Sequence, residues 1–182
     1  MCRIVRRSPA VWAWILLAAA ASCKEPTPGQ IPGNGPRSGV SEAEPLDPAK
    51  IAAGQTLYVP AYSHVLTAND ARPFNLALTL SIRNTDRTHP ILLTGINYFD
   101  RDGKQVRQYL KKPQRLAPMA SAEIFVKEKD TSAGSSASFL VDWVAERKVS
   151  DPISEVVMIG TASTQGISFT CTGRVIADRS RP

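Results

Sequence analysis

Histidine, cysteine and aromatic residues are all scarce in this chain. The 182 residues include two histidines, three cysteines and 7% aromatic residues. The sequence contains neither a His-Glu-x-x-His metalloprotease motif nor a phosphate-binding loop. The segment Gly166-Ile-Ser168-Phe-Thr170 comes nearest to the Gly-x-Ser-x-Gly hydrolase motif, but it lacks the second glycine. Because no catalytic motif is found, the sequence does not predict an enzyme, and no cofactor is expected.

The few cysteines and histidines are predicted to have structural roles. Cys171 alternates with Ile167, Phe169 and Val175, so it is expected to point inward as an inert thiol. His64 is expected to be a hydrogen-bonded structural residue. A Cys171–His64 nucleophilic pair is the alternative, but no motif supports it.

The first 23 residues have the pattern of an export signal. Three arginines, Arg3, Arg6 and Arg7, precede an apolar run at residues 10–21, which is too short to span a membrane as a helix. The small residues before Cys23 resemble a bacterial lipobox, so Cys23 is predicted to be the lipid-attachment residue. The alternatives are ordinary cleavage at residues 21–22, which would release a soluble protein, and twin-arginine export.

This leader predicts where the protein resides and which partners it meets. Lys24, rather than Asp, follows Cys23, which by resemblance to enterobacterial sorting favours the outer membrane facing the periplasm. The lipid bilayer would then be a partner through the acylated Cys23. Removing three leader arginines lowers Lys+Arg from 22 to 19 against 16 acidic residues, so a nucleic-acid partner is not expected. Cys2 would leave with the leader, so no intramolecular disulfide is expected.

Composition divides the chain into four parts. Residues 24–50 are rich in proline and glycine and nearly free of large apolar residues, which is typical of a linker. The predicted organisation is a signal peptide at 1–22, the lipid-attachment cysteine and linker at 23–53, a single domain at 54–178 and a tail at 179–182.

The domain shows the period-two alternation of β-strands. Asp100-Arg-Asp-Gly103 predicts a hairpin turn because Asp and Gly tolerate positive φ. We expect an all-β, antiparallel β-sandwich of the immunoglobulin or fibronectin type with seven or eight strands. The expected strands cover residues 57–65, 74–82, 91–99, 106–110, 120–126, 139–143, 156–159 and 167–176.

Antiparallel strands would place the loops alternately at two ends of the sandwich. One end would collect loops 68–73, 100–103, 130–137 and 161–166, and with them four aspartates: Asp70, Asp100, Asp102 and Asp130. Asp100-Arg-Asp-Gly103 resembles the start of a calcium loop, although Lys111 stands where such a loop needs Glu. The four aspartates are therefore weak candidates for a calcium site.

The other end would collect loops 86–90, 111–118 and 147–152. Its predicted basic patch consists of Arg87, Lys111, Lys112, Arg115, Arg147 and Lys148. Against Asp86 and Asp151, this patch gives a charge of about +4. Since the linker and the tail would also lie here, we expect this end to face anionic head groups of the membrane, unless the charges are simply solvated.

Several runs of the domain resemble one known family. They are Leu57-Tyr-Val-Pro-Ala-Tyr-Ser-His64, Leu80-Ser-Ile-Arg-Asn-Thr-Asp86, Tyr98-Phe-Asp-Arg-Asp-Gly103, Glu128-Lys-Asp-Thr-Ser-Ala-Gly134 and the segments from Met158 to Val175. The chain is similar to the uncharacterised bacterial family catalogued as domain of unknown function 3124. The resemblance implies a small exported domain, often with a lipoprotein-like leader, and it supplies no activity or catalytic residues.

Three classes of function follow from these features. The first is a membrane-tethered binding module that meets an envelope protein or polymer. The second is a calcium-dependent module or enzyme that uses the acidic loops. The third is a purely structural envelope component.

Overall fold

The protein forms an all-β sandwich of antiparallel sheets. A computed structural model describes residues 39–66, 73–161 and 166–180. Its strands are β1 (Val40–Glu42), β2 (Ala53–Ala61), β3 (His64–Val65), β4 (Phe74–Asn75), β5 (Ala77–Arg83), β6 (Ile91–Phe99), β7 (Gln105–Gln108), β8 (Gln114–Leu116), β9 (Ser121–Val126), β10 (Ala137–Ala145), β11 (Ile153–Gly160), β12 (Ile167–Thr172) and β13 (Arg174–Asp178). Two 3₁₀ turns, η1 (Pro48–Lys50) and η2 (Gly134–Ser136), complete the described elements. No helix within these ranges is long and apolar enough to cross a membrane.

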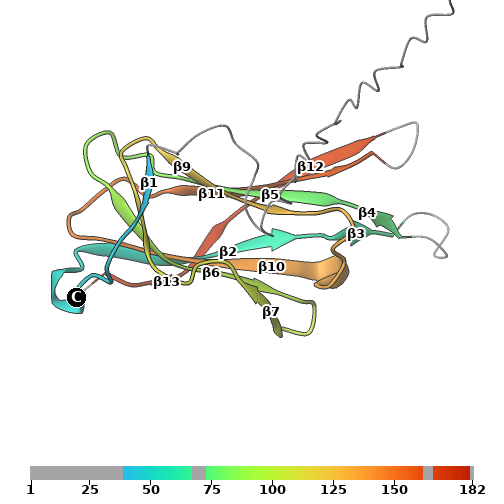
Figure 1. The fold of residues 1–182 in the computed structure, drawn as a ribbon, viewed down its shortest axis with the longest axis horizontal. Coiled ribbons are helices and arrows are strands. Elements are labelled where there is room, and N and C mark those ends of the chain that lie inside the picture. Colours follow the sequence, from blue (N-terminus) through green and yellow to red (C-terminus); the bar gives the residue numbers. More distant parts are fainter. Residues whose placement is uncertain (1–38, 67–72, 162–165, 181–182) are drawn as a thin grey trace, which may run out of the picture.

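Two sheets pack face to face (Figure 1). The larger sheet has the order β1-β8-β6-β10-β2-β13, and β7 also pairs with β6. The smaller sheet has the order β12-β11-β5-β9, and β3 and β4 form a separate short hairpin. All pairings between these strands are antiparallel, as the alternating sequence predicts.

The core lies between the two sheets and follows the predicted alternation. Leu76, Leu78, Leu80 and Ile82 are all fully buried. From the larger sheet, β10 contributes Phe139, Val141 and Trp143, which are also fully buried. Burying one such side chain contributes about 1.5–3 kcal/mol. Because the whole core cluster falls within residues 57–158 and every strand pairs within residues 40–178, the described part holds its own core.

The segment before β2 departs from the predicted linker. β1 pairs with β8, through Val40 with Leu116 and Glu42 with Gln114. The following residues 43–52, here called the strap, cross to the start of β2. The strap is fastened at both ends, since the amide of Ala43 donates to Pro113 O (2.9 Å) and that of Ala52 donates to Ala145 O (2.9 Å). A proline-rich composition does not reveal these contacts, because their partners lie about 70 to 100 residues further along the chain.

The edge of the larger sheet also differs from the prediction. β7 and β8 both run antiparallel to β6, so residues 105–116 form one interrupted strand beside β6, with β1 covering only its β8 part. The amide of Tyr109 donates to Ile96 O (2.9 Å), and this hydrogen bond holds the segment between β7 and β8 beside β6. Lys111 and Lys112 were predicted in an end loop, but they lie along this edge.

The last strand changes sheets at Gly173. β12 pairs with β11 in the smaller sheet, and β13 pairs with β2 in the larger one. A Cβ at Gly173 would lie 3.0 Å from Val59 Cγ2 and 3.1 Å from Ser154 O, so the crossing needs the small residue. Because the strand turns here, Val175 is 51% exposed and does not face inward as predicted.

Chain connections gather at two ends of the sandwich. The proximal end comprises residues 84–90, 117–120 and 146–152, and the distal end comprises residues 100–104 and 127–136. Both limits of the described chain lie at the proximal end, because Ala117 N donates to Gly39 O (2.9 Å) and Arg179 N donates to Gly54 O (2.8 Å). Arg179, predicted to begin a tail, instead pairs with Asp142 on the larger sheet (2.8 Å).

Candidate functional site

The turn at the distal end is the predicted hairpin turn. Asp100 Oδ1 accepts hydrogen bonds from the amides of Asp102 (2.9 Å) and Lys104 (2.8 Å). Gly103 has a φ of +77°, which explains the glycine at this position. The Asp100 carboxylate therefore stabilises the turn that joins β6 to β7.

Asp130 is engaged by a basic partner. Its Oδ2 lies 2.9 Å from Arg107 Nη2, and its Oδ1 accepts the Ser132 hydroxyl at 2.5 Å. Burial opposes ionisation of Asp130, but the hydrogen bonds from Ser132 and Arg107 outweigh burial and lower the pKa. Arg107 also donates to the Tyr109 hydroxyl (3.1 Å).

The structure does not gather the acidic candidates into a metal site. In the described ranges, no three His, Cys, Asp or Glu residues form a group that could hold a metal ion. Asp102 is exposed beside Arg101, and Asp70 lies outside the described residues. A calcium site that involves Asp70 stays a prediction.

His64 and Cys171 occupy ordinary structural positions. His64 Nδ1 lies 3.4 Å from the hydroxyl of the buried Ser63, which donates to Gly134 O. Cys171 is half-buried against the core, and burial raises the pKa of its thiol. A higher pKa lowers the thiolate fraction, which weakens the case for a nucleophile.

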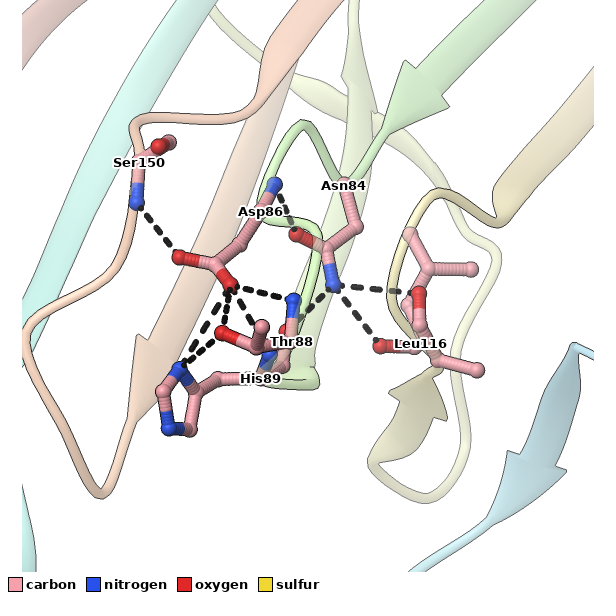
Figure 2. Close-up of polar contacts among 7 residues, drawn as sticks. Asn84, Asp86, Thr88, His89, Leu116 and Ser150 are labelled. Atoms are coloured by element: carbon pink, nitrogen blue, oxygen red, sulfur yellow. Dashed lines mark hydrogen bonds and ion pairs between the residues drawn. The ribbon is translucent and has the colours of Figure 1, made fainter.

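At the proximal end, the Asp86 carboxylate ties two connections together (Figure 2). Its Oδ1 accepts the amides of Thr88 (2.9 Å) and His89 (2.8 Å), and its Oδ2 accepts the amide of Ser150 (3.1 Å). These backbone hydrogen bonds, with that from Thr88 the strongest, hold the pKa of Asp86 well below its usual range. Asp86 thereby fixes connection 84–90 against connection 146–152.

Asn84 joins the same loop to a third connection. It is buried, and its Nδ2 donates to the carbonyls of His89 (2.9 Å), Ala117 (3.0 Å) and Leu116 (3.2 Å). Its Oδ1 accepts the amide of Asp86 (3.0 Å). The sequence alone assigns Asn84 no role and identifies Asp86 only as a counter-charge to the basic patch. The Asn-x-Asp-x-Thr spacing, which is typical of Asx turns, was the available signal.

A pocket of about 420 Å³ opens beside this network. Leu92 and Val144 lie on its floor, at the outer face of the larger sheet, where Leu92 pairs with both Arg115 and Val144. The strap covers one side through Ala43, Glu44 and Leu46. The remaining residues that line the pocket are His89, Pro90, Ile91, Ala145, Glu146 and Arg147.

The predicted basic patch is only partly assembled. Arg115 and Arg147 line the pocket, and Arg87 and Lys148 are exposed at the same end. Lys111 and Lys112 lie on the edge of the sheet, where Lys112 pairs with Glu42 (3.2 Å).

The structure also corrects the predicted charge of this end. With the strap, Arg115 and residues 178–180 included, the described cations are Lys50, Arg87, Arg115, Arg147, Lys148 and Arg179, and the described anions are Glu44, Asp47, Asp86, Glu146, Asp151 and Asp178. The positive and negative charges therefore balance. The predicted excess of about +4 does not hold for this set, because Lys111 and Lys112 lie elsewhere, the strap adds two acidic residues against Lys50, and Glu146 adds another acidic residue.

We expect Asp86→Asn to change how stability depends on acid. Since folding lowers the Asp86 pKa, its ionised form stabilises the fold above about pH 4, and this contribution disappears as the pH falls further. The variant should melt several degrees below the parent chain from pH 5 to 7, and the gap should narrow below pH 4. Melting temperatures measured across this range check the prediction.

Asp151→Asn is the matched control. Asp151 is exposed at the same end, and its backbone carbonyl, not its carboxylate, accepts the Thr85 hydroxyl (2.7 Å). An acid profile of Asp86→Asn that runs parallel to that of the parent chain would contradict the assigned role of Asp86.

Comparisons with known proteins give one family and one distant structure. A family model described as "Protein of unknown function (DUF3124)" matches residues 54–176. No curated protein matches the chain. A solved structure described as "Crystal Structure of Thermotoga maritima 1070" is 13% identical, with a TM-score of 0.40, and the match covers 66% of this chain and 92% of that one.

Proposed function

The chain belongs to the DUF3124 family of proteins of unknown function, and from this premise we propose that it is a lipid-anchored binding module of the bacterial envelope. The proposed anchor is the acylated Cys23, in the outer membrane facing the periplasm. The module would act through contact with ligands or partners and would carry no catalytic centre. Its distal end would remain available to an envelope protein or polymer.

One observation carries this proposal: the polypeptide reaches the sandwich at the end that holds the pocket. The described chain begins at Gly39, which accepts a hydrogen bond from Ala117 at the proximal end. Fifteen residues lie between Cys23 and Gly39. Even fully extended, they span at most about 55 Å, so an anchored Cys23 keeps the proximal end near the bilayer.

A tether of this length limits distance more than orientation. Nine-residue strands such as β2 and β10 give the sandwich a length of about 30 Å. The domain could therefore turn on its tether unless the proximal end itself contacts the membrane. We propose that it does, with Arg87 and Lys148 among the side chains at the bilayer surface.

A photo-crosslinking amino acid at two matched positions tests this orientation. In the acylated full chain on phospholipid vesicles, a probe at Arg87 should give at least about fivefold more lipid adduct than a probe at Lys129. Both residues are exposed and charged, and they lie at opposite ends of the sandwich. The yield of lipid adduct, measured by mass spectrometry, is the readout.

The control is the same pair of probes in Cys23→Ser chains, with both chains tested on vesicles of phosphatidylcholine alone. On these vesicles neither position of the Cys23→Ser chain should label lipid above background. Equal labelling at the two positions of the acylated chain would contradict the proposed orientation. A higher yield of lipid adduct at Lys129 than at Arg87 would show that the distal end, not the proximal end, faces the membrane.

A further inference from the structure

We propose that the pocket at the proximal end binds the zwitterionic head group of a phospholipid with a primary ammonium, such as phosphatidylethanolamine. This inference rests on the proposed function, since it identifies what the membrane-facing end contacts. It begins from the walls of the pocket, which combine an apolar floor with charged side chains of both signs.

The pocket is a built feature of the fold. The strap that covers it is hydrogen-bonded at Ala43 to Pro113 and at Ala52 to Ala145. On the opposite side, Asp86 holds His89 against the connection that carries Arg147, through Ser150. These hydrogen bonds hold the backbone on both sides of the pocket. Its volume of about 420 Å³ falls in the range typical of small-molecule sites.

Four charged side chains that line the pocket are exposed and form no ion pair within the described part of the chain. Arg115 and Arg147 are cationic, and Glu44 and Glu146 are anionic, yet none of the four forms a described ion pair. Elsewhere at this end, Arg179 and Asp142 do pair. The pocket therefore offers donors for an oxyanion and acceptors for an ammonium at the same time.

A zwitterionic head group matches this set of side chains. Its phosphate can accept charge-assisted hydrogen bonds from Arg115 and Arg147, which suit planar bidentate contacts. Its ammonium can donate to Glu44 and Glu146. The apolar floor formed by Leu92 and Val144 is suited to the carbon atoms between and beyond the two charges.

The balanced charge of the proximal end favours the same ligand. A strongly basic surface would select anionic lipids through long-range attraction. Here the described cations and anions are equal in number, so selectivity must come from short-range contacts. A primary ammonium can donate hydrogen bonds to carboxylates, whereas the trimethylammonium of phosphatidylcholine cannot, and this difference defines the test.

The experiment measures how residues 24–182 sediment with three kinds of vesicle. This part contains all the strands and the core cluster that the structure describes, so it is expected to fold without the leader. The vesicles consist of phosphatidylcholine alone, with phosphatidylethanolamine, or with phosphatidylglycerol. We expect at least tenfold tighter binding to the ethanolamine vesicles than to either of the others.

Three double variants locate the effect. Arg115→Gln with Arg147→Gln should abolish binding to ethanolamine vesicles, and Glu44→Gln with Glu146→Gln should reduce it to the phosphatidylcholine level. Lys127→Gln with Lys129→Gln, at the distal end, should leave it unchanged. Unchanged melting temperatures of the pocket variants confirm that they fold.

Each other outcome overturns the head-group proposal. Equal binding to all vesicles, or an ethanolamine preference that survives both pocket variants, removes the pocket from lipid recognition. Preference for phosphatidylglycerol would show that the proximal end binds anionic lipids by simple charge attraction rather than recognising an ethanolamine head group. The proposed lipid anchor at Cys23 would be unaffected by that result. A melting temperature raised by free leucine, without vesicle preference, would assign the pocket to a soluble zwitterion. Whether the proximal end faces the membrane at all is tested separately, by the photo-crosslinking probes at Arg87 and Lys129.

Discussion

Replacing Cys23 by serine is expected to abolish lipid attachment completely. Acylation of a lipoprotein begins on the cysteine thiol, and a serine hydroxyl offers no equivalent site. Each buried methylene of an acyl chain contributes about 0.8 kcal/mol to membrane affinity, and several chains together anchor firmly. In a bacterial host, the parent chain should incorporate labelled fatty acid and partition into detergent, and the Cys23→Ser chain should do neither.

Cys171→Ser is the control that the chain itself provides. Cys171 is half-buried on β12 and faces the core, so its loss should leave fatty-acid labelling unchanged. Labelling that persists in Cys23→Ser would place the lipid elsewhere. A parent chain that takes up no label would favour the alternative of ordinary cleavage at residues 21–22.

The fold class was predictable because alternation is a local property. Every second residue from Leu76, just before β5, to Ile82 within it is fully buried, as the stripe in the sequence predicts. In β10 the same holds for Phe139, Val141 and Trp143. Side chains of a strand must alternate between faces, so a two-layer all-β fold follows from the pattern alone. The structure confirms the antiparallel sandwich.

The strand count was less predictable, since the described residues form thirteen strands where seven or eight were expected. The additional strands are mostly short. β1, with three residues, depends on β8, more than 70 residues later, and β8 exists only beside β6. Such strands are defined by long-range pairing and have no periodic stripe of their own.

Most of the candidate site could not be predicted for the same reason, because it depends on long-range pairing. Arg115 and Arg147 were singled out from the sequence, but only as part of a charged surface. The strap adds Glu44 to the lining of the same pocket. From the sequence, the strap is predicted to be a linker because it is rich in proline. A pocket lined by the neighbouring strands β8, β6 and β10 and by a crossing segment requires the sheet order, which the sequence did not provide.

Asn84→Asp is expected to be the most destabilising single-atom exchange at the proximal end. The amide nitrogen of Asn84 faces three carbonyl oxygens within 3.2 Å, and the residue is 2% exposed. A carboxylate of the same shape cannot donate to these carbonyls and brings a buried, unpaired charge. The expected loss is about 3–5 kcal/mol at pH 7, and Asn84→Ala should lose about 2–4 kcal/mol. Urea unfolding measures both values.

The pH dependence of Asn84→Asp separates this explanation from a general packing defect. Three carbonyl oxygens disfavour ionisation, so folding should raise the pKa of the introduced carboxyl. Its neutral form would be tolerated below about pH 4, and stability would be lost as the pH rises. This trend is opposite to that expected from Asp86, whose contribution is lost as the pH falls. Gln108→Glu, the same exchange at an exposed position of β7, should change stability by less than about 0.5 kcal/mol. A loss in Asn84→Asp that is constant from pH 4 to 7 would show that burial of charge is not its cause.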